Sequence, residues 1–118
     1  MKKLKNERMK KFEFEELYRS NRVGEPILDA VTDALRKTHT VQSADIANLL
    51  EVRKRDLGGA VLILTGTTLD WLIRIWRTRQ AQDLLAEGRL SEQQIAYRCG
   101  WKSVRVMRRH LSRANSTI

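Results

Sequence analysis

The side chains of this chain that are best suited to chemistry are three arginines near its C-terminus. Arg105, Arg108 and Arg109 fall on one face of a predicted helix. A guanidinium group can make a bidentate contact with guanine or hold a phosphate oxygen. The pattern favours a helix that offers cations to DNA, against the alternative of a merely solvated cationic face. The opposite face carries apolar residues at i, i+3 and i+7: Val104, Met107 and Leu111.

Further side chains extend this predicted surface. Lys102 and Arg113 flank the three arginines, and Ser103 can cap the start of their helix. Lys54 and Arg55 stand at the start of an earlier predicted helix, where we expect phosphate contact, although simple solvation explains them nearly as well. The predicted DNA-binding residues are Lys54, Arg55, Lys102, Ser103, Arg105, Arg108, Arg109 and Arg113.

The positive charge is concentrated at the two ends of the chain. The 118 residues carry a formal net charge of +9. Residues 1–11 hold six Lys or Arg against one Glu, and residues 101–118 hold five against no acid, so the segment between them sums to −1. A polyanionic partner is therefore favoured. Because the C-terminal charge coincides with the predicted arginine face, we expect that partner to be double-stranded DNA.

The sequence lacks the arrangements expected of an enzyme, a metal site or a cofactor site. It contains no glycine-rich phosphate loop, no HExxH and no nucleophile beside paired carboxylates. Asp29 and Asp33 lie one helical turn apart, on what we expect to be an ordinary exposed face. His39 and His110 have no partners at metal-ligand spacing. Cys99 is the single cysteine and is predicted to be a small buried core residue.

The hydropathy pattern predicts no membrane segment. No apolar run approaches the ~20 residues that span a bilayer. The basic start is not followed by the apolar core of a signal peptide. We therefore expect a cytoplasmic, nucleoid-associated protein without a membrane partner.

Apolar periodicity and capping signals predict an all-α chain. Pro26 suits the first position of a helix, and Gly66 and Gly88 suit positions just after helix ends. Thr68 can cap a long helix, and Ser91 can form a capping box with Gln94. Residues 12–18 fit either a strand-like arm or a helical turn. The predicted helices, with their capping residues, span about 26–37, 43–50, 54–64, 69–87, 91–100 and 103–114.

The long predicted helix should pack through one stripe of apolar residues. That stripe comprises Leu69, Leu72, Ile73 and Trp76, followed by Leu84 and Leu85. Trp101 is also expected to pack in a core, whereas Trp71 is expected to be partly exposed.

A helix-turn-helix pattern occurs twice. The pair Ile46-Ala47 recurs as Ile95-Ala96, each followed by a turn and a second helix. The expected organisation is two three-helix units joined by one long linker helix. Its parts are a basic N-terminal tail or arm over 1–24, a first helix-turn-helix unit over 25–66, the linker helix over 67–88 and a second unit over 89–118.

This pattern resembles the DNA-binding domain of the AraC/XylS family of transcription regulators, in its small stand-alone form. The resemblance implies recognition helices at about 54–64 and 103–114 that enter successive major grooves, with the chain acting as a monomer on an asymmetric site. It assigns Arg105 and Arg109 to bases, Lys102 and Arg113 to the DNA backbone, and a structural role to Arg77. The residues that carry it are Ile46, Ala47, Leu57, Thr65, Gly66, Arg77, Ala81, Leu84, Leu85, Ser91, Ile95, Ala96, Gly100, Trp101, Ser103 and Arg109.

Two departures from the family pattern keep a second hypothesis open. The base-reading positions of the first recognition helix fall on Gly58 and Gly59, and an apolar run follows at 62–64. The family's closing Pro-x-x-Tyr-Arg-like segment is also missing. The leading hypothesis is a sequence-specific regulator of transcription that reads the major groove mainly through its second unit, with RNA polymerase or another protein as a further partner. The alternative is a protein-interaction module on a degenerate helix-turn-helix fold; non-specific binding through the tail is a third, weaker one.

Overall fold

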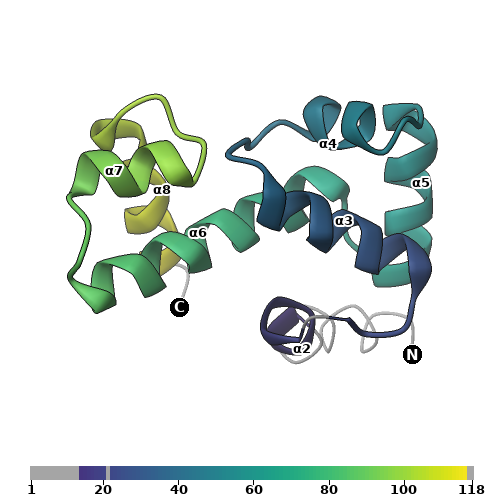
Figure 1. The fold of residues 1–118 in the computed structure, drawn as a ribbon, viewed down its shortest axis with the longest axis horizontal. Helices are drawn as coiled ribbons and strands as arrows, with labels where there is room; N and C mark the ends of the chain where they lie inside the picture. Colours follow the sequence, from purple (N-terminus) through teal and green to yellow (C-terminus); the bar gives the residue numbers. More distant parts are fainter. Residues whose placement is uncertain (1–13, 21, 117–118) are drawn as a thin grey trace.

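The described part of the protein is entirely helical. The computed structural model describes residues 14–20 and 22–116, with the side chains of 114–116 excepted. Every regular element in these residues is an α-helix, which confirms the predicted all-α class (Figure 1). The helices are α2 (Phe14–Arg19), α3 (Pro26–Lys37), α4 (Ser43–Leu49), α5 (Lys54–Thr65), α6 (Leu69–Glu87), α7 (Glu92–Arg98) and α8 (Val104–Ser116).

The helix ends follow the local capping chemistry that the sequence predicts. The Thr68 hydroxyl accepts a hydrogen bond from the Trp71 amide at 3.0 Å, which fixes the start of α6. Ser91 and Gln94 form the predicted reciprocal capping box at the start of α7. Gly66 ends α5 in the left-handed conformation, with φ of 79°. These signals set where each helix begins and therefore which side chains share a face.

Helix α6 runs between two helical groups that each bury their own core (Figure 1). Trp76 and Trp101 are buried, as predicted, and Trp71 is partly exposed. Leu85 is not part of the inner stripe, because its side chain is 39% exposed. The first core contains Phe14, Leu17, Val31, Ala34, Leu35, Ile46, Ala47, Leu57, Val61, Leu69, Leu72, Ile73 and Trp76. The second contains Ala81, Ile95, Ala96, Cys99, Trp101 and Met107.

The N-terminal segment contributes a packed helix. Of the predicted tail or arm over 1–24, residues 1–13 lie outside the described residues. Of the segment 12–18, where the choice was left open, the described residues 14–18 belong to helix α2. Tyr18 packs edge-on against Trp76 at 4.8 Å and donates a hydrogen bond to Asp83 at 3.0 Å. Arg79 pairs with Glu15. These contacts dock α2 on α6.

Asp29 does not lie on an exposed face, contrary to the sequence-based expectation. Its side chain is buried, whereas that of Asp33 is exposed. The Asp29 carboxylate accepts hydrogen bonds from the backbone amides of Val23 at 2.7 Å and Gly24 at 3.1 Å. It therefore holds the turn between α2 and α3, a structural role that the spacing from Asp33 does not reveal.

The connection between α3 and α4 joins the two helical groups. Arg77 of α6 is fully buried and donates hydrogen bonds to the backbone oxygens of Thr38 at 3.0 Å and Thr40 at 2.9 Å. Gly100 has φ of 82°, and a Cβ built there would lie 2.7 Å from the carbonyl oxygen of His39. Val41 packs against both cores. Because the junction is close-packed and hydrogen-bonded, it fixes α5 and α8 relative to each other.

No single helix among the described residues has the length and hydropathy to cross a membrane. Helices α5 and α6 meet those criteria only as a pair, and they are bent by 74° at the break between them.

Candidate nucleic-acid interface

The basic face of α8 lies at the surface, and the opposite face of the helix packs on the second core. Arg105, Arg108 and Arg109 are all exposed, while Met107 on the opposite side of the helix is fully buried. His110 stacks on Trp101, with ring centroids 5.6 Å apart, and its partial burial lowers its pKa. The helix is therefore anchored by apolar and aromatic contacts that leave the guanidinium groups facing outward.

The start of α8 places two more candidate residues beside this face. The Ser103 hydroxyl accepts a hydrogen bond from the Val106 amide at 3.2 Å, so Ser103 caps α8 as predicted. Lys102 and Arg113 are exposed. The first turn of α8 contains no acidic residue. Six of the eight predicted contact residues thus lie on α8 or directly before it.

An ion pair on this face escaped the sequence analysis. Glu92, the first residue of α7, accepts two hydrogen bonds from Arg108, at 2.9 and 2.5 Å. This bidentate pairing lowers the pKa of Glu92 and raises that of Arg108. The two residues are sixteen positions apart, so no local spacing rule could have found the contact. The Arg108 side chain is therefore already paired with Glu92, whereas the sequence predicted it only as a DNA ligand.

Charge divides unequally between the two helical groups. Residues 88–113 contain seven Lys or Arg and one Glu, whereas residues 25–66 contain five Lys or Arg and six Asp or Glu. A strongly basic surface attracts polyanions by long-range Coulomb forces. The electrostatic attraction for a nucleic acid should thus be centred on α7 and α8.

Helix α5 carries the other two candidate residues. Lys54 and Arg55 are exposed in its first turn, and Arg53 directly before it pairs with Asp56 at 3.2 Å. Helices α5 and α8 lie near opposite ends of α6 (Figure 1). The structure therefore does not gather all eight candidate residues into one cluster; it places them in two separate groups.

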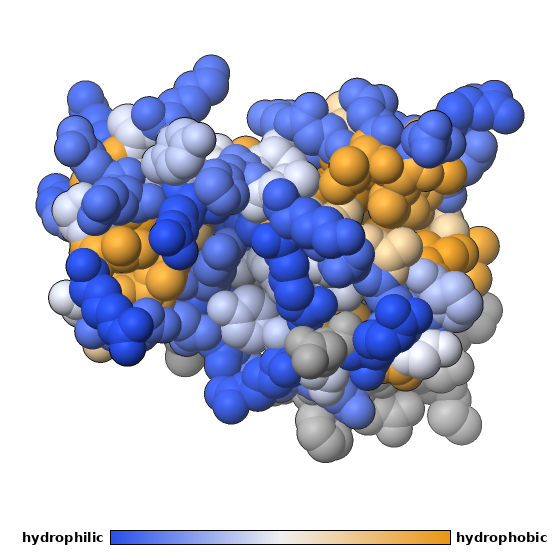
Figure 2. All heavy atoms as spheres, viewed as in Figure 1, coloured by the Kyte–Doolittle hydropathy of each residue, from blue (hydrophilic) through white to orange (hydrophobic). Residues whose placement is uncertain are grey.

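The outward side of α5 combines bare backbone with apolar side chains. A Cβ added at Gly58 or Gly59 would meet nothing within 4 Å. Leu62, Ile63 and Leu64 are exposed by 49%, 86% and 40%. Figure 2 shows a hydrophobic area over the end of the molecule that α4 and α5 form. This surface differs from α8 in both charge and hydropathy.

A shallow groove of about 470 Å³ lies along α7, beside the junction. His39 packs edge-on against Tyr97 at 5.2 Å, and Arg98 and Leu90 complete much of its wall. The Cys99 thiol lies in the second core, where burial raises its pKa to about 11. A buried thiol of this kind is neutral and unreactive at physiological pH.

Comparisons with protein-family models, with curated proteins and with solved structures give no match for this chain.

Proposed function

We propose that this protein binds double-stranded DNA and regulates transcription, and that it reads the major groove mainly through α8. The observation that carries the proposal is the exposed cationic face of a helix whose other face is fixed in a core. On this proposal Arg105 and Arg109 contact bases, and Lys102 and Arg113 contact phosphates. Exposure of all four side chains supports these roles. On this proposal the chain is related to the DNA-binding domain of the AraC/XylS regulators.

The size of the protein would allow both helical groups to contact one duplex. Helices α5 and α8 lie near the two ends of a structure whose longest extent is 39 Å. One turn of B-DNA rises by about 34 Å, which separates successive major grooves on one face of the duplex. The hydrogen-bonded junction around Arg77 would hold the two helices at a fixed spacing. Such rigidity favours one register on the duplex.

The two groups should contribute differently to sequence recognition. Arginine side chains on α8 can distinguish bases by bidentate hydrogen bonds. Gly58 and Gly59 on α5 have no side chains to do so, although they allow the backbone of α5 to approach DNA closely. Lys54 and Arg55 would then hold phosphates. We infer one well-specified half-site under α8 and a poorly specified one under α5.

A salt titration tests whether DNA binding occurs at all. If about five phosphates are neutralised, a plot of log affinity against log salt should have a slope of about −4 to −5, because each phosphate contributes about 0.9. Fluorescence anisotropy with a labelled duplex measures this slope. A matched pair of double variants, Arg105→Ala with Arg109→Ala and Lys2→Ala with Lys3→Ala, separates α8 from the N-terminal residues. No binding at low salt, or salt-independent binding, would overturn the proposal.

A second candidate function is favoured by the exposure of Leu62, Ile63 and Leu64. Buried leucines would have counted against a protein-interaction module, but these side chains are exposed. Contiguous exposed apolar surface marks interaction sites more often than isolated apolar residues do. The α5 surface therefore suits a protein partner better than it suits the polar edges of DNA bases.

One substitution separates the two candidate functions. Ile63→Glu places a negative charge on the most exposed hydrophobic side chain of α5 without disturbing a core. If α5 lies against DNA, this variant should weaken duplex binding by repulsion. If α5 serves only a protein partner while α8 binds DNA, duplex affinity should be almost unchanged.

A further inference from the structure

Gly59, Leu62 and Ile63 share one outward face of α5. Leu57, Val61 and Thr65 are buried and mark the inner face. Gly59 and Ile63, one helical turn apart, lie on the opposite side, and Leu62 lies beside them. Along this face, the bare backbone at Gly59 is thus followed, toward the C-terminal end of α5, by the exposed side chains of Leu62 and Ile63.

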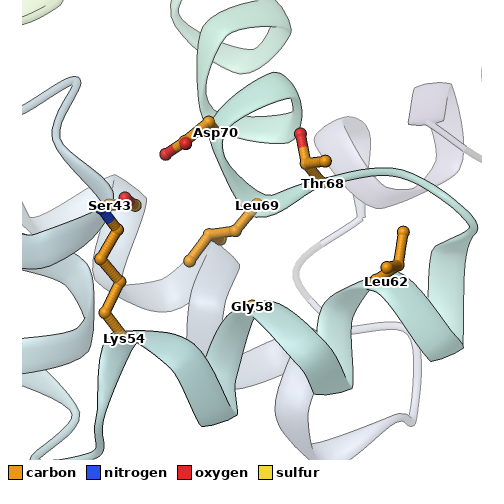
Figure 3. Close-up of a pocket in the computed structure, with 7 residues that line it drawn as sticks. All are labelled: Ser43, Lys54, Gly58, Leu62, Thr68, Leu69 and Asp70. Carbon is orange, nitrogen blue, oxygen red and sulfur yellow. The ribbon is translucent and has the colours of Figure 1, made fainter.

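A groove adjoins this face. It has a volume of about 190 Å³ and lies between α5, the start of α6 and Ser43 of α4. Figure 3 shows Lys54, Gly58 and Leu62 on successive turns of α5, across from Leu69 and Asp70 of α6. Because Gly58 has no side chain, the α5 wall of the groove is open between Lys54 and Leu62.

The two ends of α5 differ in charge. Arg53, Lys54 and Arg55 stand at its start, against the single acid Asp56. The last turn of α5 contains no basic residue. The helix dipole also makes a C-terminal end electronegative. In an antiparallel neighbour of the same sequence, the basic start of each α5 would therefore lie near the electronegative end of the other.

We propose that this face of α5 binds a second copy of the chain, as an antiparallel α5–α5 pair about a two-fold axis near residues 60–61. In this register Leu62 and Ile63 of one copy lie over the bare backbone at Gly58 and Gly59 of the other. Lys54 and Arg55 approach the end of the other copy's α5. Glycine permits the close helix approach that such packing needs, and a self-complementary patch is what a two-fold interface requires.

This pairing does not rest on the proposed DNA-binding function, and it is an alternative to the sequence-based expectation of a monomer. The face of α5 that is covered in the pair cannot contact DNA at the same time, so the paired protein would contact DNA through α8. One helix face from each copy forms a small interface, so the dimer should be weak, with a dissociation constant in the micromolar range or above. Helix α8 lies at the other end of the molecule and stays accessible in both copies (Figure 1). The pair would thus present two basic faces.

Sedimentation velocity of the full chain without DNA tests the pairing. From about 5 µM to about 1 mM, the weight-average sedimentation coefficient should rise from the monomer value toward the dimer value. Ile63→Glu should weaken association at least about tenfold, because it replaces buried apolar area with a charge. The matched control is Leu85→Glu on α6, which changes another exposed aliphatic residue and should leave association unchanged.

A second variant separates close helix packing from general hydrophobic adhesion. Gly59→Leu adds apolar surface, and its Cβ meets nothing within the monomer. If the helices pack closely at Gly59, this variant should weaken association at least about tenfold by steric separation. General adhesion predicts the reverse.

Three results would overturn the pairing: a monomer at every concentration, stronger association of Gly59→Leu, or equal loss in Ile63→Glu and Leu85→Glu. Circular dichroism checks that each variant is folded.

Discussion

Removing the Arg109 side chain should change sequence preference more than overall affinity. The side chain is exposed on α8, while the helix is held by buried Met107, so Arg109→Ala should leave the fold intact. A bidentate contact with a base provides about 1–3 kcal/mol of discrimination. At about 1.4 kcal/mol per factor of ten, the preference for a selected duplex over a shuffled one should fall by about 5- to 150-fold.

Two duplexes and one control variant measure this change. Anisotropy titrations compare the selected and shuffled duplexes at a single salt concentration, because the electrostatic part of the affinity depends on salt. Arg89→Ala removes an equal charge from an exposed position between α6 and α7. It should weaken both duplexes by a similar, smaller factor. If Arg109→Ala also weakens both duplexes equally, α8 does not read bases through Arg109.

Three further predictions concern the ion pair, the glycines and the cysteine. Glu92→Gln should release Arg108 for phosphate and steepen the salt slope by about 1, measured by the same titration; an unchanged slope would show that Arg108 stays away from DNA. In urea unfolding, Gly59→Ala should add about 0.8–1.0 kcal/mol to the free energy of unfolding. Gly100→Ala should lower the free energy of unfolding, because its Cβ would strike backbone in a left-handed turn. A change of the same sign for both variants would contradict the packing. Cys99 should react with a thiol reagent far more slowly in the folded protein than in urea at pH 8. Because its pKa of about 11 lies above the reference value of 9.0, its contribution to stability should be intact below pH 9 and lost as pH rises toward 11.

The helices could be predicted because their signals are local. Thr68, Ser91 and Gln94 act within three residues of their own positions, and Gly66 and Gly88 act at the ends of the helices that they terminate. Such contacts depend on little besides the neighbouring sequence. The outward position of the α8 arginines also followed from local periodicity alone.

The contacts between distant segments could not be predicted in the same way. The Glu92–Arg108 pair joins two helices, and buried Asp29 is held by the turn that precedes its own helix. Gly100 fits against a backbone segment about sixty residues earlier in the chain. These features depend on how helices pack, which apolar spacing constrains only to a face. Leu85 illustrates the limit: Leu84 packs against the second core, whereas the next residue, Leu85, lies on a different face of α6 and is exposed.

Selection of binding sites from random duplex DNA tests the central claim most directly. The account predicts enrichment of one sharply specified block of base pairs, which Arg105→Ala and Arg109→Ala abolish, beside a weakly specified block about one helical turn away. Enrichment of no sequence, or of two equally sharp blocks that survive those substitutions, would contradict the claim that α8 is the principal reader of DNA.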